Sequence, residues 1–229
     1  MGLFDFIFPK RCVSCKKLDS YLCENCFTFL SFDVKSLCLA CNKPSFNGLT
    51  HSKCKKKYSI DGCFSAISSN KIAHKLIYTF KQKPYLSDLK HVLTDLFYES
   101  VIQNEEFIKQ IVSGEWMMVP VPLSKTKLRK RGYNQSKILA NELAKKFNIP
   151  VADVLERNRD TKTQAGLSRI EKRLNVKNVF EITNHKFLIN KNIFLIDDVV
   201  TTGATLSQAA KLLKENAAKK VIGLTLVRD

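Results

Sequence analysis

From residue 59 onward, apolar residues recur along the chain in two alternating periods. Steps of three and four residues predict amphipathic helices, and short apolar runs predict buried strands. The helical pattern covers residues 71–81, 89–102, 133–147 and 205–218. The strand pattern covers residues 61–68, 116–122, 177–182, 192–197 and 220–227. Strands that alternate with helices predict an α/β fold, in which helices cover both faces of a parallel sheet.

The first 58 residues follow neither period and are rich in cysteine instead. Seven of the eight cysteines of the chain lie before residue 55. The composition changes within the stretch KCKKKYSIDG, which begins at residue 53. We therefore expect two domains, a small cysteine-rich segment over residues 1–58 and an α/β domain over residues 59–229.

The cysteine spacing is typical of zinc-binding knuckles. Six cysteines form three C-x-x-C pairs, and a fourth pair has histidine in the first place. Two-residue spacing presents two ligands to one ion, and zinc takes four ligands tetrahedrally. The eight candidate ligands, enough for one or two structural zinc ions, are Cys12, Cys15, Cys23, Cys26, Cys38, Cys41, His51 and Cys54. The second ion depends on His51, and sequential and interleaved pairings of the knuckles both remain open. Cys63 lies in an apolar run and is expected in the core.

The expected compartment supports zinc over a disulfide framework. No run approaches the ~18 consecutive apolar residues of a membrane-spanning helix. The opening residues 1–9 are too short, and at Asp5 too acidic, for a signal peptide. We therefore expect a cytoplasmic protein without a membrane span, in which cysteines stay reduced. A redox site or an iron–sulfur cluster fits less well, because no βαβ pattern accompanies the cysteines and one ligand is histidine.

The net charge of the chain indicates which kinds of partner it favours. Lys and Arg number 38 against 21 Asp and Glu, which gives a formal net charge of +17. Such an excess favours polyanions, namely nucleic acid, phosphorylated metabolites or an anionic membrane surface. A solvated basic surface without a polyanionic partner is the alternative that charge alone leaves open.

One strand pattern ends in an unusual way. The apolar run that begins at Asn192 stops at the adjacent acids Asp197 and Asp198. A turn of hydroxyl and small residues, from Thr201 to Thr205, then enters a helical pattern. In open α/β sheets, ligands bind at the carboxyl ends of the strands. Adjacent acids there accept hydrogen bonds from a ribose diol, and backbone N–H groups at a helix start bind phosphate. The stretch therefore predicts a sugar-phosphate site.

The sequence FLIDDVVTTGAT, residues 194–205, resembles the phosphoribosyl pyrophosphate (PRPP) loop of the type I phosphoribosyltransferases. The resemblance implies a type I phosphoribosyltransferase-like sheet and a PRPP-binding loop. The residues it assigns to this loop are Asp197, Asp198, Val199, Val200, Thr201, Thr202, Gly203, Ala204 and Thr205.

The stretch VPVPLSKTKLRKRGYNQS, residues 119–136, is predicted to be a strand, a basic loop and a helix start. The same resemblance implies that the loop after this strand holds the pyrophosphate of PRPP. The residues expected to contact it or to shape the turn are Arg131, Gly132, Asn134 and Gln135. Arginine suits this role because its guanidinium binds phosphate with two hydrogen bonds. Lys81, in the stretch FKQK, is a further candidate cation.

Taken together, the cysteine knuckles, these two stretches and the polar stretch over residues 157–175 resemble the ComF family of competence proteins. The resemblance implies a zinc-ribbon-like segment, a phosphoribosyltransferase-like domain, and a role in natural transformation, the uptake of single-stranded DNA into the cytoplasm. His51 departs from the family, in which this position is often cysteine. The implied partners are single-stranded DNA, PRPP, and a competence helicase of the ComFA type or a recombination mediator.

The chemistry implied for PRPP is loss of pyrophosphate as a nucleophile reaches the sugar. Asp197, Asp198 and Arg131 would be the catalytic residues, and Mg²⁺ would be held mainly by the PRPP oxygens. We expect residues 157–175 to form a mobile loop that leads into a short helix and closes over the site. The loop residues proposed for this closure are Arg157, Arg159, Thr163, Gln164 and Arg169.

Three functions fit the sequence. The first is a DNA-handling protein of natural transformation that binds PRPP or a related ligand. The second is an active phosphoribosyltransferase of nucleotide or sugar metabolism. The third is an interaction module whose zinc knuckles dock a partner protein. We favour the first, because no residue set specifies a nucleophile and because the charge is strongly basic.

Overall fold

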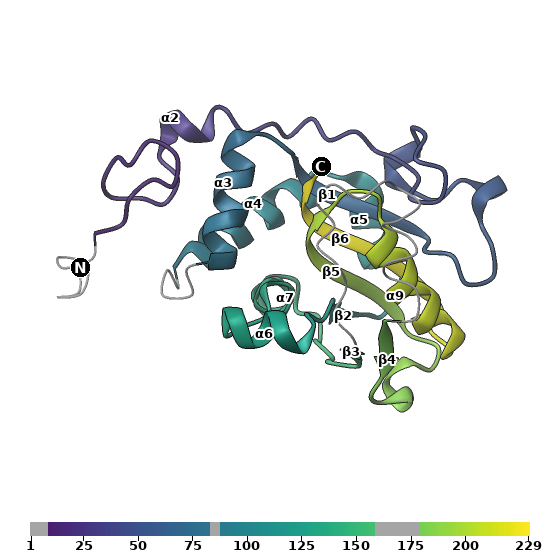
Figure 1. The fold of residues 1–229 in the computed structure, drawn as a ribbon. Coiled ribbons are helices and arrows are strands. Elements are labelled where there is room, and N and C mark those ends of the chain that lie inside the picture. Colours follow the sequence, from purple (N-terminus) through teal and green to yellow (C-terminus); the bar gives the residue numbers. More distant parts are fainter. Residues whose placement is uncertain (1–8, 83–87, 159–178) are drawn as a thin grey trace.

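The computed structural model describes residues 9–82, 88–158 and 179–229. Its centre is a parallel sheet of four strands in the order β1-β6-β5-β2, which confirms the predicted α/β fold (Figure 1). The strands are β1 (Gly62–Ser68), β2 (Trp116–Pro120), β5 (Asn192–Val200) and β6 (Lys220–Arg228). Their buried apolar runs face helices on both sides, as expected for a parallel sheet.

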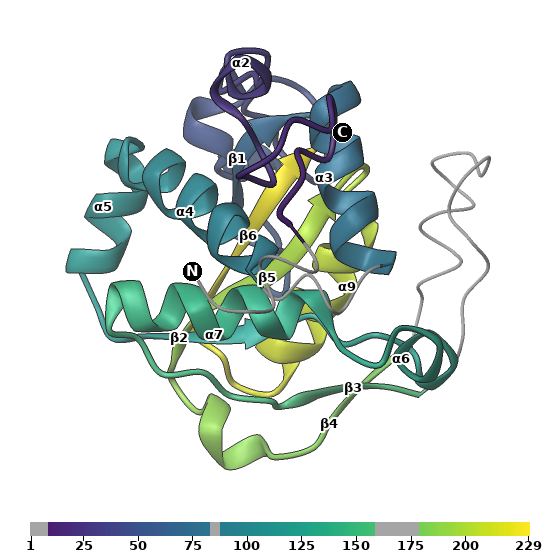
Figure 2. The same ribbon diagram turned by 90° about the vertical axis from the view of Figure 1, so that its left-hand side faces the viewer.

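Helices cover the two faces unequally (Figure 2). The first face packs against α3 (Lys71–Gln82), α4 (Leu89–Ile102), α5 (Glu105–Val112) and α7 (Gln135–Phe147). The second face packs against α9 (Ala204–Glu215). Fully buried Phe194 lies at the centre of the first layer, stacked on Trp116 with ring centroids 3.9 Å apart. None of the helices in the described part of the chain has the length and apolarity that crossing a bilayer requires.

The basic stretch after β2 was expected to be a loop and is helical instead. Residues Lys125–Arg131 form α6, which begins after Ser124 and ends at Gly132. Gly132 adopts φ 79°, and its N–H donates to the Leu128 carbonyl, as in a helix end with a left-handed cap. Lysine and arginine are good helix formers, so charge density did not prevent a helix here. The cations of the stretch are therefore carried on a helix rather than on an extended loop.

Three further details differ from the sequence prediction. The strand expected over residues 177–182 appears as β4 (Phe180–Ile182), which pairs antiparallel with β3 (Leu155–Arg157) outside the main sheet. Strand β5 continues beyond the acids to Val200, because β6 is long enough to pair with it there. Helix α5 was not predicted; its signals are the Asn104 cap and two acids in its first turn.

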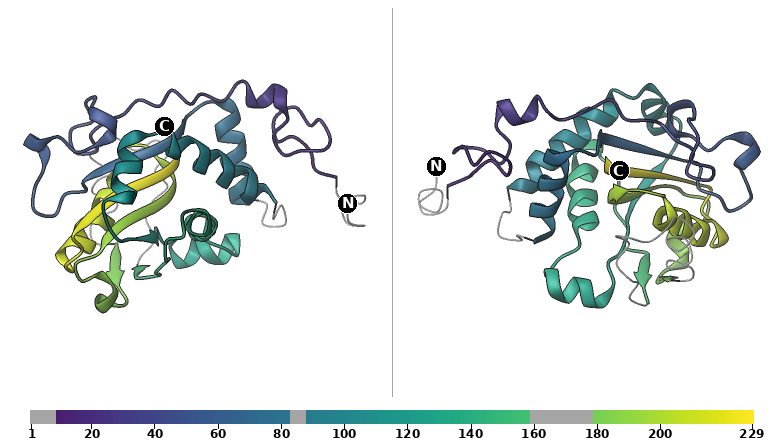
Figure 3. Two further views of the ribbon diagram at one scale, coloured as in Figure 1. Left: turned by 180° about the vertical axis from the view of Figure 1, so that it is seen from behind. Right: turned by 45° about the horizontal axis from the view of Figure 1, so that its top comes forward.

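The cysteine-rich segment contacts both ends of the edge strand β1. Its first half carries α2 (Glu24–Phe27), and its second half carries the short 3₁₀ helices η1 (Phe46–Gly48) and η2 (Ser52–Cys54). The two halves lie toward opposite ends of the sheet, joined by a linker that passes over it (Figures 1 and 3). At one end of β1 the Ser68 N–H donates to Ser31, and at the other end Gly62 bridges to Leu49. The segment therefore covers an otherwise open sheet edge.

A buried ion pair ties this edge to α9. Asp61 lies 2.7 Å from Lys214, and their side chains are only 6% and 7% exposed. The Asp61 carboxylate also accepts a hydrogen bond from the Val221 N–H at 2.9 Å. Removing one partner of a buried pair leaves the other charge without compensation.

We expect Lys214→Met to lower the free energy of unfolding by about 3 kcal/mol, because it leaves the buried Asp61 carboxylate with weaker partners. The matched control is Lys211→Met on the same helix, whose pair with Glu215 is exposed. That control is expected to change stability by no more than about 0.5 kcal/mol. Urea unfolding of the zinc-loaded chain measures both, and equal effects of the two substitutions would refute the structural role of the pair.

Candidate functional site

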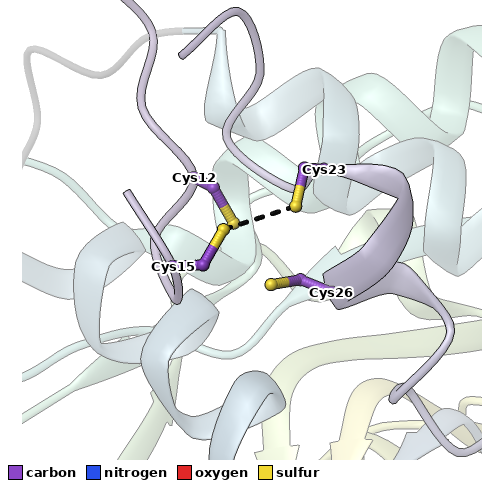
Figure 4. A group of neighbouring side chains, drawn as sticks. All are labelled: Cys12, Cys15, Cys23 and Cys26. Atoms are coloured by element: carbon purple, nitrogen blue, oxygen red, sulfur yellow. Dashed lines mark hydrogen bonds between the residues drawn. The ribbon is translucent and has the colours of Figure 1, made fainter. Parts of the chain in front are cut away.

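The first cysteine cluster unites the first two knuckles of the sequence. Cys12 and Cys15 come from one turn, and Cys23 and Cys26 from the start of α2 (Figure 4). All four sulfur atoms lie within 4.8 Å of one another. The Cys15 and Cys23 sulfurs are 3.5 Å apart. Sulfur ligands of a tetrahedral zinc ion lie about 3.8 Å apart, so the cluster fits zinc.

The second cluster unites Cys38, Cys41, His51 and Cys54 within the same 4.8 Å limit. The knuckles therefore pair sequentially, which settles the alternative that the sequence left open. His51 directs Nδ1 toward the Cys41 sulfur at 3.3 Å and Nε2 toward the Pro44 carbonyl at 2.9 Å. A carbonyl only accepts hydrogen bonds, so Nε2 carries the proton and Nδ1 is left as a metal ligand.

Backbone N–H groups favour the ionised form of one thiol in each cluster. Burial raises the pKa of the Cys12 thiol, but the backbone N–H groups of Cys15 and Cys23 outweigh it and lower the pKa to about 6. The same balance, with the Cys41 and His51 N–H groups, lowers the pKa of Cys38 to about 7. Each cluster thus holds a readily formed thiolate, the form that binds zinc.

We expect the purified chain to carry two zinc ions, one per cluster. Cys12→Ser and Cys38→Ser should each lose one ion, whereas Cys63→Ser should keep both because Cys63 is buried in β1, as predicted for a core residue. Atomic absorption of dialysed protein gives the zinc count per chain. A wild-type count of one, or a loss in the Cys63→Ser control, would contradict this assignment.

A hydrogen bond joins the acid pair, Asp197 and Asp198, to α7, which follows β2 and α6 in the chain. The Ser136 hydroxyl, in the first turn of α7, donates to Asp197 Oδ1 at 3.0 Å. The same oxygen accepts from the Asp198 backbone N–H at 2.9 Å. Because β2 and β5 are parallel neighbours, the segments after their carboxyl ends meet at one edge of the sheet. Ser136 was not singled out from the sequence, although it ends the stretch that carries the predicted basic site.

The second acid pairs with a cation from another element. Asp198 lies 2.9 Å from the Lys81 ammonium, in the last turn of α3. Asp198 is 7% exposed, so this charge is held largely out of water. Lys81 was named from the sequence as a candidate near the site, and the fold brings it into direct contact with the acid pair.

The start of α7 presents donors beside the acids. Asn134 caps the helix, accepting from the Ser136 N–H at 3.1 Å and donating to the Val121 carbonyl at 3.0 Å. Arg131 donates to the Gln135 side-chain carbonyl at 2.9 Å. Gln135 is 1% exposed, and its side-chain N–H₂ group has no hydrogen-bond partner among the described residues. A buried orphan donor of this kind fits an anionic ligand.

The turn after β5 is pressed against the zinc-binding segment. Gly203 adopts φ 70°, and a Cβ placed on it would lie 2.7 Å from the Leu39 side chain. Leu39 sits between Cys38 and Cys41 and is 1% exposed. This position therefore requires glycine on two counts, its backbone conformation and the close approach. The contact with Leu39 was not predicted, because nothing in the sequence places a cysteine knuckle beside the turn.

The other predicted residues fall into four groups. Thr201, Thr202, Ala204 and Thr205 form the turn and the helix start beside the acids. Val199 and Val200 belong to β5, and the side chain of Val200 packs in the core, so it offers the site only its backbone. Arg157 was expected to begin the mobile loop, but it ends strand β3, is 8% exposed and lies over the Phe180 ring at 5.7 Å. The loop residues Arg159, Thr163, Gln164 and Arg169 lie outside the described residues.

The ionised form of Asp197 is disfavoured in the folded chain. Burial, and then the charge of Asp198, raise the pKa of Asp197 to about 7, against the opposing effects of Lys81 and two hydrogen bonds. The folded chain thus retains a proton that the unfolded chain releases near pH ~3.9.

Between about pH 4 and pH 7, stability should therefore fall as pH rises, by up to ~1.4 kcal/mol per pH unit from this group. We expect the unfolding free energy of Asp197→Asn to lack this pH dependence. The unfolding free energy of the variant minus that of wild type should therefore increase as pH rises from about 4 to about 7. Urea unfolding over the pH range measures the difference, with the exposed Asp33→Asn as control. A pH-independent difference between wild type and Asp197→Asn would refute the raised pKa.

Comparison with known proteins agrees with both parts of the chain. Residues 3–56 match the double zinc ribbon domain, and residues 134–229 match the phosphoribosyl transferase domain. Competence protein ComFC of Streptococcus pneumoniae is 30% identical over 216 residues, which cover 92% of this chain and 89% of that protein.

Two further relatives match over a shorter stretch. Competence protein F of Haemophilus influenzae is 36% identical over 111 residues, 45% of this chain and 46% of that protein. DNA utilization protein YhgH of Escherichia coli is 34% identical over 105 residues, 45% of each chain. The match thus spans less than half the length of these two relatives, but the ComFC match extends over nearly the whole chain. The chain belongs to the ComF family and combines a double zinc ribbon with a phosphoribosyltransferase-like domain.

Proposed function

We propose that this protein binds PRPP, or a related phosphoribosyl ligand, and handles single-stranded DNA during natural transformation in the cytoplasm. The observation that carries the proposal is the contact between Ser136 and Asp197, at 3.0 Å. It joins the acid pair within β5 to the start of α7, which follows β2 and α6 in the chain. This contact supports a single site in which the acids bind a diol and the donors bind phosphates.

Each group of the site has a role in this proposal. Asp197 and Asp198 accept hydrogen bonds from the ribose diol. The turn from Thr201 to Thr205 and the N-terminus of α9 bind the sugar phosphate. Arg131 and the orphan amide of Gln135 bind the pyrophosphate, whose charge Mg²⁺ would partly neutralise when it arrives with the ligand.

The names of the relatives and the charge of the chain support the DNA part of the proposal. Two of the relatives are named competence proteins and one a DNA utilization protein. Helix α6 carries five Lys or Arg residues in seven positions and comes soon after β2. Such a helix suits the phosphate backbone of a nucleic acid.

A second candidate function is an active phosphoribosyltransferase. The specific observation in its favour is the pair of unlike acids, one with a pKa raised to about 7 and one in an ion pair with Lys81. A carboxyl group that exchanges its proton near neutral pH is suited to general acid–base catalysis. The acceptor nucleophile of such a reaction is not specified by the described residues.

The zinc-binding segment is the surface that we propose for a protein partner, a competence helicase of the ComFA type or a recombination mediator. Phe29 and Phe46, in its two halves, are 69% and 75% exposed. Exposed aromatic side chains of this kind are enriched in protein interfaces.

PRPP binding tests the first part of the proposal. We expect Asp198→Asn and Arg131→Met to weaken Mg²⁺–PRPP binding at least tenfold, about 1.4 kcal/mol, because each removes a charged contact. Isothermal titration calorimetry measures the affinity, with the exposed Asp33→Asn as the matched control. Equal affinity in all variants, or no binding by wild type, would refute the proposed site. In phosphorus NMR, pyrophosphate release with a mixture of bases and amines that requires Asp198 would establish the second function instead.

Single-stranded DNA binding tests the second part. We expect an affinity that falls steeply with salt, because phosphate contacts release counterions. Replacing Lys125, Arg129 and Lys130 by alanine should reduce the slope of log affinity against log salt by roughly 2, at ~0.7 per lost contact. The control replaces Lys186, Lys211 and Lys219, which are exposed elsewhere. Fluorescence anisotropy gives both slopes, and an unchanged slope in the α6 variant would exclude this helix from the DNA interface.

A further inference from the structure

A small cavity lies at the edge of β1, where the linker between the two zinc clusters passes over the sheet. Its volume is about 210 Å³. Residues from the linker, from β1, from the α4–α5 junction and from β6 line it, among them Phe32, Lys35, Ser36, Ser65, Asn104 and Arg228. None of the residues assigned to the phosphoribosyl site is among its described lining residues. The cavity is therefore a separate feature of the molecule.

Arg228, the last residue of β6, is the buried charge of this cavity. It is 7% exposed, and one of its terminal nitrogens, Nη2, is buried with no hydrogen-bond partner among the described residues. Within the described part of the chain, no carboxylate lies within ion-pair distance of this guanidinium. Burial lowers the pKa of Arg228, but an arginine stays protonated in proteins. The guanidinium is therefore a cation without a counter-ion among the described residues.

The neighbouring thiol does not supply the missing charge. Burial raises the pKa of Cys63 to about 11, so this thiol is neutral at physiological pH. No aspartate or glutamate is among the described residues that line the cavity. A buried cation is unfavourable unless a hydrogen-bonding anion compensates it, and water accepts hydrogen bonds without neutralising the charge.

Several other polar side chains of the cavity can donate hydrogen bonds. Lys35 and Ser36 approach from the linker, and Asn104 from the cap of α5. The Asn104 carbonyl oxygen is occupied by the Phe107 N–H at 3.0 Å, which leaves its side-chain N–H₂ group as the part available to a ligand. Donors from two separate elements, the linker and the cap of α5, thus line the same cavity as the orphan guanidinium.

We propose that this cavity is a binding site for a small oxyanion, a phosphate or a short carboxylate, held between Arg228 and Lys35. A volume of about 210 Å³ holds one such ion with a few waters, each of which takes ~30 Å³ in the liquid. The ion would connect the linker, through Lys35, to the sheet, through Arg228.

The test uses the zinc-loaded full chain, inorganic phosphate and malonate as probes, and constant ionic strength. Calorimetric titration is done on wild type, Arg228→Met, Lys35→Met and Lys186→Met. Lys186→Met is the matched control, because it removes an exposed cation that does not line the cavity. A crystal soaked with selenate, an anomalous scatterer, locates the ion directly.

We expect saturable binding in wild type and in Lys186→Met, at least a tenfold loss in Arg228→Met, and a smaller loss with the exposed Lys35→Met. Stronger binding of phosphate than of malonate would identify a phosphate site, and the reverse a carboxylate site. Without added oxyanion, the melting temperature of Arg228→Met should equal or exceed that of wild type, because an uncompensated buried charge is removed. Lower stability irrespective of oxyanion, unchanged affinity in Arg228→Met, or selenate absent from the cavity would overturn the proposal.

Discussion

Residues far apart in the sequence meet in this protein because β2 and β5 are parallel neighbours. Their carboxyl ends lie at the same edge of the sheet, so the segments that leave the two strands are brought together there. The hydrogen bond from Ser136 to Asp197 closes this junction. The ion pair between Asp198 and Lys81 brings the last turn of α3 to the same acids. A shift of β5 by one residue would turn the acids to the opposite face and dismantle the site.

Much of this arrangement was predictable, because the periodicity that identifies an element also identifies its buried face. The strands β1, β2 and β6 and the helices α3, α4 and α7 lie close to where the apolar pattern put them. The zinc ligands were predictable for a different reason, because a C-x-x-C spacing lets one tight turn present two thiolates to the same ion. How the knuckles pair is a question of chain path, and the sequence left it open.

The errors have physical causes as well. Helix α6 was missed because its surface carries charge on every side, with no apolar stripe to reveal a period. Strand β4 was expected in the parallel sheet, although a three-residue strand gives no signal for its partner. The acids were placed at the end of β5, whereas pairing with β6 extends that strand to Val200. Local pattern does not report how far a neighbouring strand reaches.

The close approach of Leu39 to Gly203 connects the cysteine-rich segment to the α/β domain. Leu39, which packs against the turn after β5, lies between the candidate zinc ligands Cys38 and Cys41. A phosphoribosyltransferase-like domain that began at residue 59 would lack Leu39, and its turn after β5 would lose this contact at Gly203. The boundary that composition draws along the sequence is thus crossed by a close contact in the folded molecule. An engineered fragment of either part would have to replace that contact.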